Sequence, residues 1–199
     1  LQQTQAAALF QKFGAVAAES TFPALVYGAF SGMALTVFNL VPSVTNMFGK
    51  SVLPCAAQSW AKGQKEAVQK QLQSVLFLTA LIALPAAGGL FCLSDSILTL
   101  LYPGQETACR IAAESLRSLL PGMVFLCFTM PLFSILQGIG RADLPVKYML
   151  PCVAVKLLGN LLFLQIPVCS LLGAGLSTSL CYALLFGMTL FSLCRMLGM

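Results

Sequence analysis

The chain has 199 residues, of which 58% are hydrophobic and only 9% are charged, with a mean hydropathy of +0.89. This composition lies outside the range of soluble domains and excludes a soluble enzyme with a large core. The net charge of +5 does not indicate a nucleic-acid partner, because the Lys and Arg residues are dispersed and are not clustered on one face.

Four stretches without a charged residue are long enough to cross a membrane: 20–49, 71–94, 118–140 and 157–194. A hydrocarbon core about 30 Å thick needs roughly 20 apolar residues of helix, and the last stretch holds one span and the end of another. We therefore predict an all-α, polytopic transmembrane helical bundle of about five spans: 24–48, 72–94, 118–138, 148–166 and 171–194. We expect residues 1–19 to be an external tail or the end of a preceding helix, and 20–199 to form the bundle.

The first predicted span carries a polar stripe. Spacings of three and four residues place its members on one helical face: Thr36, Asn39, Ser43, Asn46 and Lys50. Amide side chains at membrane depth are costly unless they meet a polar partner or water. Two interpretations stay open, because the stripe could hydrogen-bond an adjacent helix and fix the packing, or it could line a hydrated cleft.

The segments between the spans alternate in charge. Segment 49–70 has a net charge of +3, segment 95–117 has a net charge of −1, and segment 139–147 is again basic. Short loops that are rich in Lys and Arg stay in the cytoplasm. We therefore predict that 49–70, 139–147 and the C-terminus lie inside and that the N-terminal tail lies outside.

Small residues recur in three patterns: GAFSG at 28–32, AAGG at 86–89 and GAGLSTS at 173–179. Lipid provides no hydrophobic drive between helices, so small residues favour association by allowing two backbones to approach closely. We predict tight helix packing at these three places.

Lys156 lies at the middle of the predicted span 148–166, too deep for its ammonium group to reach either interface easily. A central Lys carries an insertion penalty of about 2.5–3.5 kcal/mol, so it should face the protein interior or water. Asn160 follows one turn later on the same face. Lys156 is therefore a candidate counter-charge for an anionic substrate; the alternative is a shifted span boundary that places it near the headgroups.

The eight cysteines lie far apart, none forms a CxxC pair, and the chain has no histidine to complete a zinc site. We predict that they act as small apolar residues. No pattern indicates a metal site, a catalytic residue or a cofactor.

Four blocks of sequence resemble a known family by their order and spacing. They are NLVPSVTNMFGKSVLPCAAQSWAKGQ at 39–64, ALPAAGGLFCLSDSILTLLYPG at 83–104, ILQGIGRADLPVK at 135–147 and VKLLGNLLFLQIPVCSLLGAGLSTSLCYAL at 155–184. Together they resemble the polysaccharide-biosynthesis flippases like stage V sporulation protein B, within the multidrug/oligosaccharidyl-lipid/polysaccharide exporter superfamily. The resemblance covers nearly the whole chain.

The resemblance implies a two-lobed exporter whose central cavity opens alternately to either side, with this chain as most of the C-terminal lobe and the N-terminal lobe missing. It implies a multi-pass flippase of the bacterial inner membrane that moves lipid-linked oligosaccharide or polysaccharide precursors for the cell envelope. Its partners would be the lipid-linked sugar and the bilayer. In the substrate path, Lys156 would offset the phosphate charge. The polar residues that would bind sugar or water are Thr36, Asn39, Ser43, Asn46 and Asn160.

One difference from the lipid II flippases limits which members of the family the chain resembles. The lipid II flippases carry an arginine shortly before the proline of the span that corresponds to 24–48. Here the residues before Pro42 read LTVFNLV and include no cation. The broader sporulation-type polysaccharide group is therefore favoured.

Two other functions remain as alternatives. A cation-coupled drug or metabolite exporter of the same fold would need buried carboxylates for proton or sodium coupling, and the predicted spans contain no Asp or Glu. A membrane-embedded transferase would need an acid, a base or a nucleophile held together. With no histidine, and with its carboxylates expected in loops, the chain is not expected to be an enzyme.

Overall fold

A computed structural model describes residues 27–164 and 170–197, with side chains for 27–159 and 175–197. These residues form a short π-helix and five α-helices, as the composition and the apolar stretches predicted. In chain order they are η2 (Ala29–Ala34), α3 (Leu35–Ala61), α4 (Lys65–Leu101), α5 (Glu106–Gly138), α6 (Asp143–Leu164) and α7 (Ser170–Leu197). The predicted tail 1–19 lies outside the described residues.

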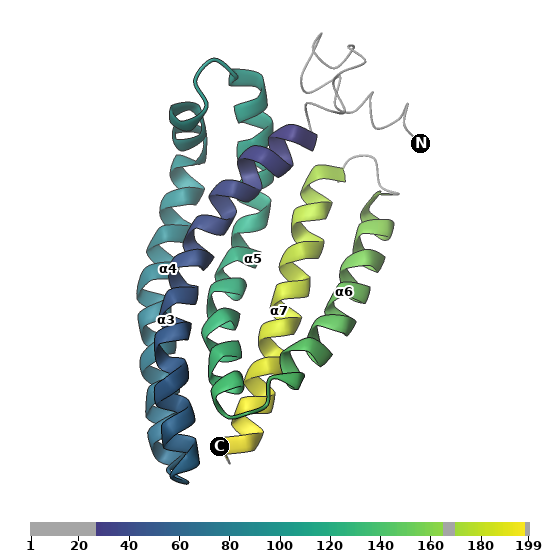
Figure 1. Ribbon diagram of the computed structural model, residues 1–199. Coiled ribbons are helices and arrows are strands. Elements are labelled where there is room, and N and C mark those ends of the chain that lie inside the picture. Colours follow the sequence, from purple (N-terminus) through teal and green to yellow (C-terminus); the bar gives the residue numbers. More distant parts are fainter. Residues whose placement is uncertain (1–26, 165–169, 198–199) are drawn as a thin grey trace.

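Helix α5 is the centre of the bundle. It packs against α3 and α4 on one side and against α7 on the other, while α6 packs mainly on α7 (Figure 1). In the most apolar part of each helix, 72% of the α5 residues are buried, compared with 17% in α4 and 28% in α7. Fully buried Leu116, Met123 and Leu132 provide much of the α5 contact surface. The core therefore lies around α5, and the other helices keep an outward face.

Those outward faces are apolar. Leu100 is 82% exposed, Phe77 is 71% exposed and Leu150 is 70% exposed. Large apolar patches of this kind on a helical bundle are expected where lipid is the solvent. By length and composition, α4, α5 and the Gly175–Leu197 part of α7 are able to cross a membrane. Crossings by α3 and α6, which would complete the predicted five, stay a prediction.

The helices extend well beyond the predicted spans, because the charged segments between them are mostly helical. The 37 residues of α4 reach about 55 Å at about 1.5 Å per residue, far longer than the hydrocarbon core. Glycines with positive φ make the short turns: Gly63 at 71°, Gly104 at 87° and Gly140 at 85°. At the α5 end, Arg141 N–H donates to the Leu136 carbonyl at 3.0 Å, a Schellman-type closure around Gly140.

The up-and-down order of the helices brings the basic turns to the same end. The α3–α4 turn, the α5–α6 turn and the end of α7 lie together, and the α4–α5 turn lies at the opposite end (Figure 1). The topology that we predicted from the alternating charges requires this arrangement. The cytoplasmic location of the basic end stays a prediction.

The small-residue pattern at 173–179 forms a close junction between α5 and α7. The Gly122 N–H donates to Ser179 Oγ at 3.0 Å, and the Ser179 hydroxyl donates to the Gly175 carbonyl at 2.9 Å. A Cβ on Gly175 would lie 2.6 Å from Ser118 Cβ. The prediction of tight packing is confirmed here.

The other two small-residue patterns do not pack in this way. A Cβ added at Gly28, Gly32, Gly88 or Gly89 would meet no atom within 4 Å. The prediction of close helix contacts at these glycines is wrong, because open space lies beside each of them, which at Gly89 is a groove between α3 and α4. Spacing alone cannot distinguish a small residue at a contact from one beside open space.

Replacing Ser179 with alanine is expected to lower the stability of the bundle by about 1–3 kcal/mol, because the buried Gly122 N–H loses its partner across the helix interface. Thermal unfolding in detergent or lipid would measure this. Ser74→Ala is the matched control, because Ser74 is exposed and donates only to the Lys70 carbonyl of its own helix. Equal unfolding temperatures for the two variants would contradict the role of the cross-helix bond.

Candidate functional site

The polar stripe of α3 lies on an exposed face, on the side away from its packing contacts. Thr36, Asn39 and Ser43 are exposed and Asn46 is partly exposed, whereas Pro42 and its neighbours on the opposite face are buried. The periodicity of the sequence therefore predicted the composition of the face correctly.

The side chains of the stripe bond to their own helix. Thr36 donates to the Gly32 carbonyl at 2.6 Å, Asn39 donates to the Leu35 carbonyl at 2.8 Å, and Ser43 donates to the Asn39 carbonyl at 2.7 Å. These bonds do not reach a neighbouring helix. These three residues therefore do not fix the packing of an adjacent helix in this structure, which was one of the two interpretations.

Lys156 lies half-buried near the middle of α6, on the edge that faces α7. It is close enough to Cys181 of α7 to influence that thiol electrostatically. Arg117–Asp95 and Lys147–Asp143 are ion pairs between described residues, and Lys156 takes part in neither. The Asn160 side chain lies outside the described residues.

The stripe and Lys156 are not brought together within this chain. Helices α5 and α7 lie between α3 and α6 (Figure 1). Within the described residues, the stripe and Lys156 therefore do not line a common pocket. Their assignment to a substrate path stays a prediction.

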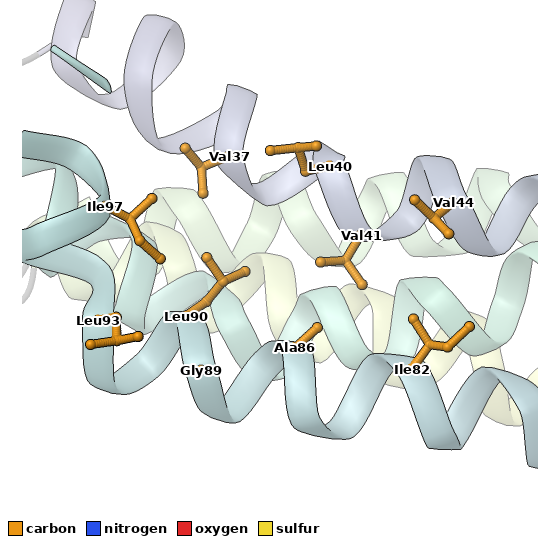
Figure 2. A pocket seen from close by; sticks show the side chains of 10 residues that line it. All are labelled: Val37, Leu40, Val41, Val44, Ile82, Ala86, Gly89, Leu90, Leu93 and Ile97. Carbon is orange, nitrogen blue, oxygen red and sulfur yellow. The ribbon is translucent and has the colours of Figure 1, made fainter. Parts of the chain in front are cut away.

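An apolar groove between α3 and α4 was not predicted. It has a volume of about 390 Å³ and is lined by Val37, Leu40, Val41 and Val44 of α3 and by six residues between Ile82 and Ile97 of α4 (Figure 2). Ala86 and Gly89 of the AAGG pattern lie in its floor, where small side chains leave space. Its lining is entirely apolar, so it is not the hydrated cleft that the stripe was expected to line.

The carboxylates among the described residues lie inside helices, which corrects their expected placement in loops. Asp95 belongs to α4, and Glu106 and Glu114 belong to α5. Asp95 accepts a hydrogen bond from Arg117 at 2.6 Å, which links α4 to α5. The prediction placed these carboxylates in loops because α4 and α5 continue past the apolar stretches that defined the predicted spans.

Comparison with known proteins adds to this geometry. The MatE family model matches residues 15–162. The chain is 25% identical over 157 residues to the uncharacterized membrane protein MJ1068 of Methanocaldococcus jannaschii, covering 79% of this chain and 30% of that protein. The chain thus spans about a third of the length of this curated relative. No solved structure matches. Together with the apolar helices, these matches describe a multi-pass membrane protein.

Proposed function

Because the chain belongs to the MatE family of exporters, we propose that it supplies one lobe of a membrane flippase for lipid-linked oligosaccharide or polysaccharide precursors. The whole protein would have a second lobe, and the substrate headgroup would cross between the lobes by alternating access. The lipid tail would stay in the bilayer. We place this flippase in the bacterial cytoplasmic membrane.

The observation that carries this proposal is the half-buried Lys156 in the middle of an apolar helix. A cation in this position is costly, and such residues commonly mark substrate or ion pathways. A lipid-linked sugar has a phosphate or pyrophosphate next to its lipid, and a buried ammonium group can offset that charge. Lys156 would hold the phosphate as the headgroup passes.

The stripe on α3 supports the same proposal. It presents Thr36, Asn39 and Ser43 on a face that no described helix covers. A second lobe facing this surface would enclose a polar passage for sugar hydroxyls. Lys156 and the stripe would then act on different parts of the substrate, which agrees with their separation in the bundle.

A cation-coupled multidrug exporter is the second candidate, because the family includes such proteins and because α4 and α5 contain carboxylates. Asp95 is held by Arg117 at 2.6 Å, and Glu114 is partly buried. Coupling requires a carboxylate that exchanges its partner for a proton or sodium ion. Asp95 already has a cationic partner and lies at the end of the bundle, so the flippase is preferred.

The test is reconstitution of the whole protein in liposomes with an undecaprenyl-pyrophosphate sugar that carries a fluorophore on its headgroup. A membrane-impermeant quencher then reports how much of the fluorophore is exposed on the outer leaflet. We expect the protected fraction to fall well below that of protein-free liposomes. Protection equal to protein-free liposomes, with transport of a cationic dye driven by a proton or sodium gradient, would favour the drug exporter.

A further inference from the structure

Two cysteines that are distant in sequence meet where α6 packs on α7. The Cys181 thiol donates to the Cys152 carbonyl at 3.2 Å across a sequence separation of 29 residues. The two side chains are also close enough to affect each other electrostatically. Cys152 is 3% exposed and Cys181 is 6% exposed, so both sulfur atoms are shielded from bulk solvent.

The surroundings of this pair are apolar apart from one cation. Phe133 and Leu185 complete the buried cluster, and Tyr148 and Tyr182 pack against it. Lys156 follows Cys152 by one helical turn and acts electrostatically on Cys181. The site therefore combines two soft sulfur ligands, a dry lining and one positive charge.

We propose that Cys152 and Cys181 bind one Cu(I) ion as a two-coordinate dithiolate whose charge is balanced by Lys156. Soft thiolate ligands select Cu(I), which is stable with two sulfur ligands in a line. A structural zinc site needs four ligands, and this pair supplies only two. The site goes beyond the proposed transport function, although it shares Lys156 with the proposed substrate path.

The charge balance favours a monovalent ion. Two S–H bonds break, two Cu–S bonds form, two protons pass to solvent, and no electron is transferred. The resulting dithiolate complex carries one negative charge, which would be costly in an apolar cluster without a partner. The Lys156 ammonium group supplies the opposite charge, whereas a divalent ion would leave that ammonium group uncompensated.

The other buried thiols provide a matched comparison. Cys127 is fully buried on α5 and lies close to Thr45 of α3. It resembles Cys152 in burial but does not share the Cys152–Cys181 contact. Cys55 and Cys92 are exposed and can be blocked first with N-ethylmaleimide.

The experiment measures Cu(I) binding to the maleimide-treated whole protein in lipid nanodiscs, in competition with the chromophoric chelator bathocuproine disulfonate. We expect one bound equivalent that is lost in C152S and in C181S and kept in C127S. K156M should weaken binding about tenfold or more, as changes to outer-shell partners of metal sites do. Absence of bound copper in the wild type, or binding retained in both C152S and C181S, would overturn the proposal.

X-ray absorption of the copper-loaded wild type provides a second measurement that does not depend on the folding of any variant. A site formed by this pair gives two sulfur neighbours around copper. Three or more sulfur neighbours, or nitrogen and oxygen neighbours, would also overturn the proposal. A pair of thiols that serves only in packing predicts no high-affinity copper in either measurement.

Discussion

Replacing Gly175 with valine is expected to destabilise the protein by about 3 kcal/mol or more, at the upper end of the range for overpacking. A Cβ at this position would lie 2.6 Å from Ser118 Cβ and 2.9 Å from the Ser118 backbone carbon. The backbone of α5 cannot move aside without breaking the Gly122–Ser179 bond as well. Thermal unfolding, with the yield of folded protein from membranes, would measure the effect.

Gly187→Val is the control for this prediction. Gly187 lies on the same helix, and a Cβ there would meet no atom within 4 Å. Valine also has a higher helix propensity than glycine, so this variant should be neutral or slightly stabilised. If both variants unfold at the same temperature, close contact between α5 and α7 is not what holds this part of the bundle together.

Replacing Lys156 with glutamine is expected to reduce movement of the lipid-linked sugar by about tenfold to a hundredfold. A hydrogen bond to a charged group contributes about 1.5–3 kcal/mol, and about 1.4 kcal/mol corresponds to a factor of ten. Lys156→Arg keeps the positive charge and should retain part of the activity. The measurements are the liposome assay described above and complementation of a flippase-deficient strain by the whole protein.

Lys147→Gln is the matched control for this second prediction. Lys147 lies on the same helix, but it is exposed and pairs with Asp143 at 2.9 Å. Exposed pairs of this kind contribute little, so transport should be unchanged. Unimpaired growth and transport with Lys156→Gln, at normal protein levels, would remove Lys156 from the mechanism.

The sequence predicted the features that depend on local periodicity. Long apolar stretches gave helices, and spacings of three and four gave the exposed stripe of Thr36, Asn39 and Ser43. The helix ends were harder to predict, because polar residues are compatible with a helix that leaves the membrane. The turns at Gly63 and Gly140 depend on positive φ values, which apolar content does not reveal.

Contacts between distant helices could not be predicted. Cys152 and Cys181 looked like isolated small residues, because periodicity gives the face of a helix and not the neighbour that the face meets. The groove beside Gly89 and the junction at Gly175 have similar sequence patterns and opposite surroundings. Which helices lie side by side determines these features.

The bonding of the α3 stripe also determines what kind of chemical group it can receive. Thr36 and Ser43 each donate their single hydroxyl hydrogen to a carbonyl of the preceding turn. Only the lone pairs of their hydroxyl oxygens remain to bond a ligand. Asn39 likewise keeps its amide oxygen available. The part of the stripe formed by Thr36, Asn39 and Ser43 is therefore rich in acceptors, which suits the O–H and N–H groups of a ligand.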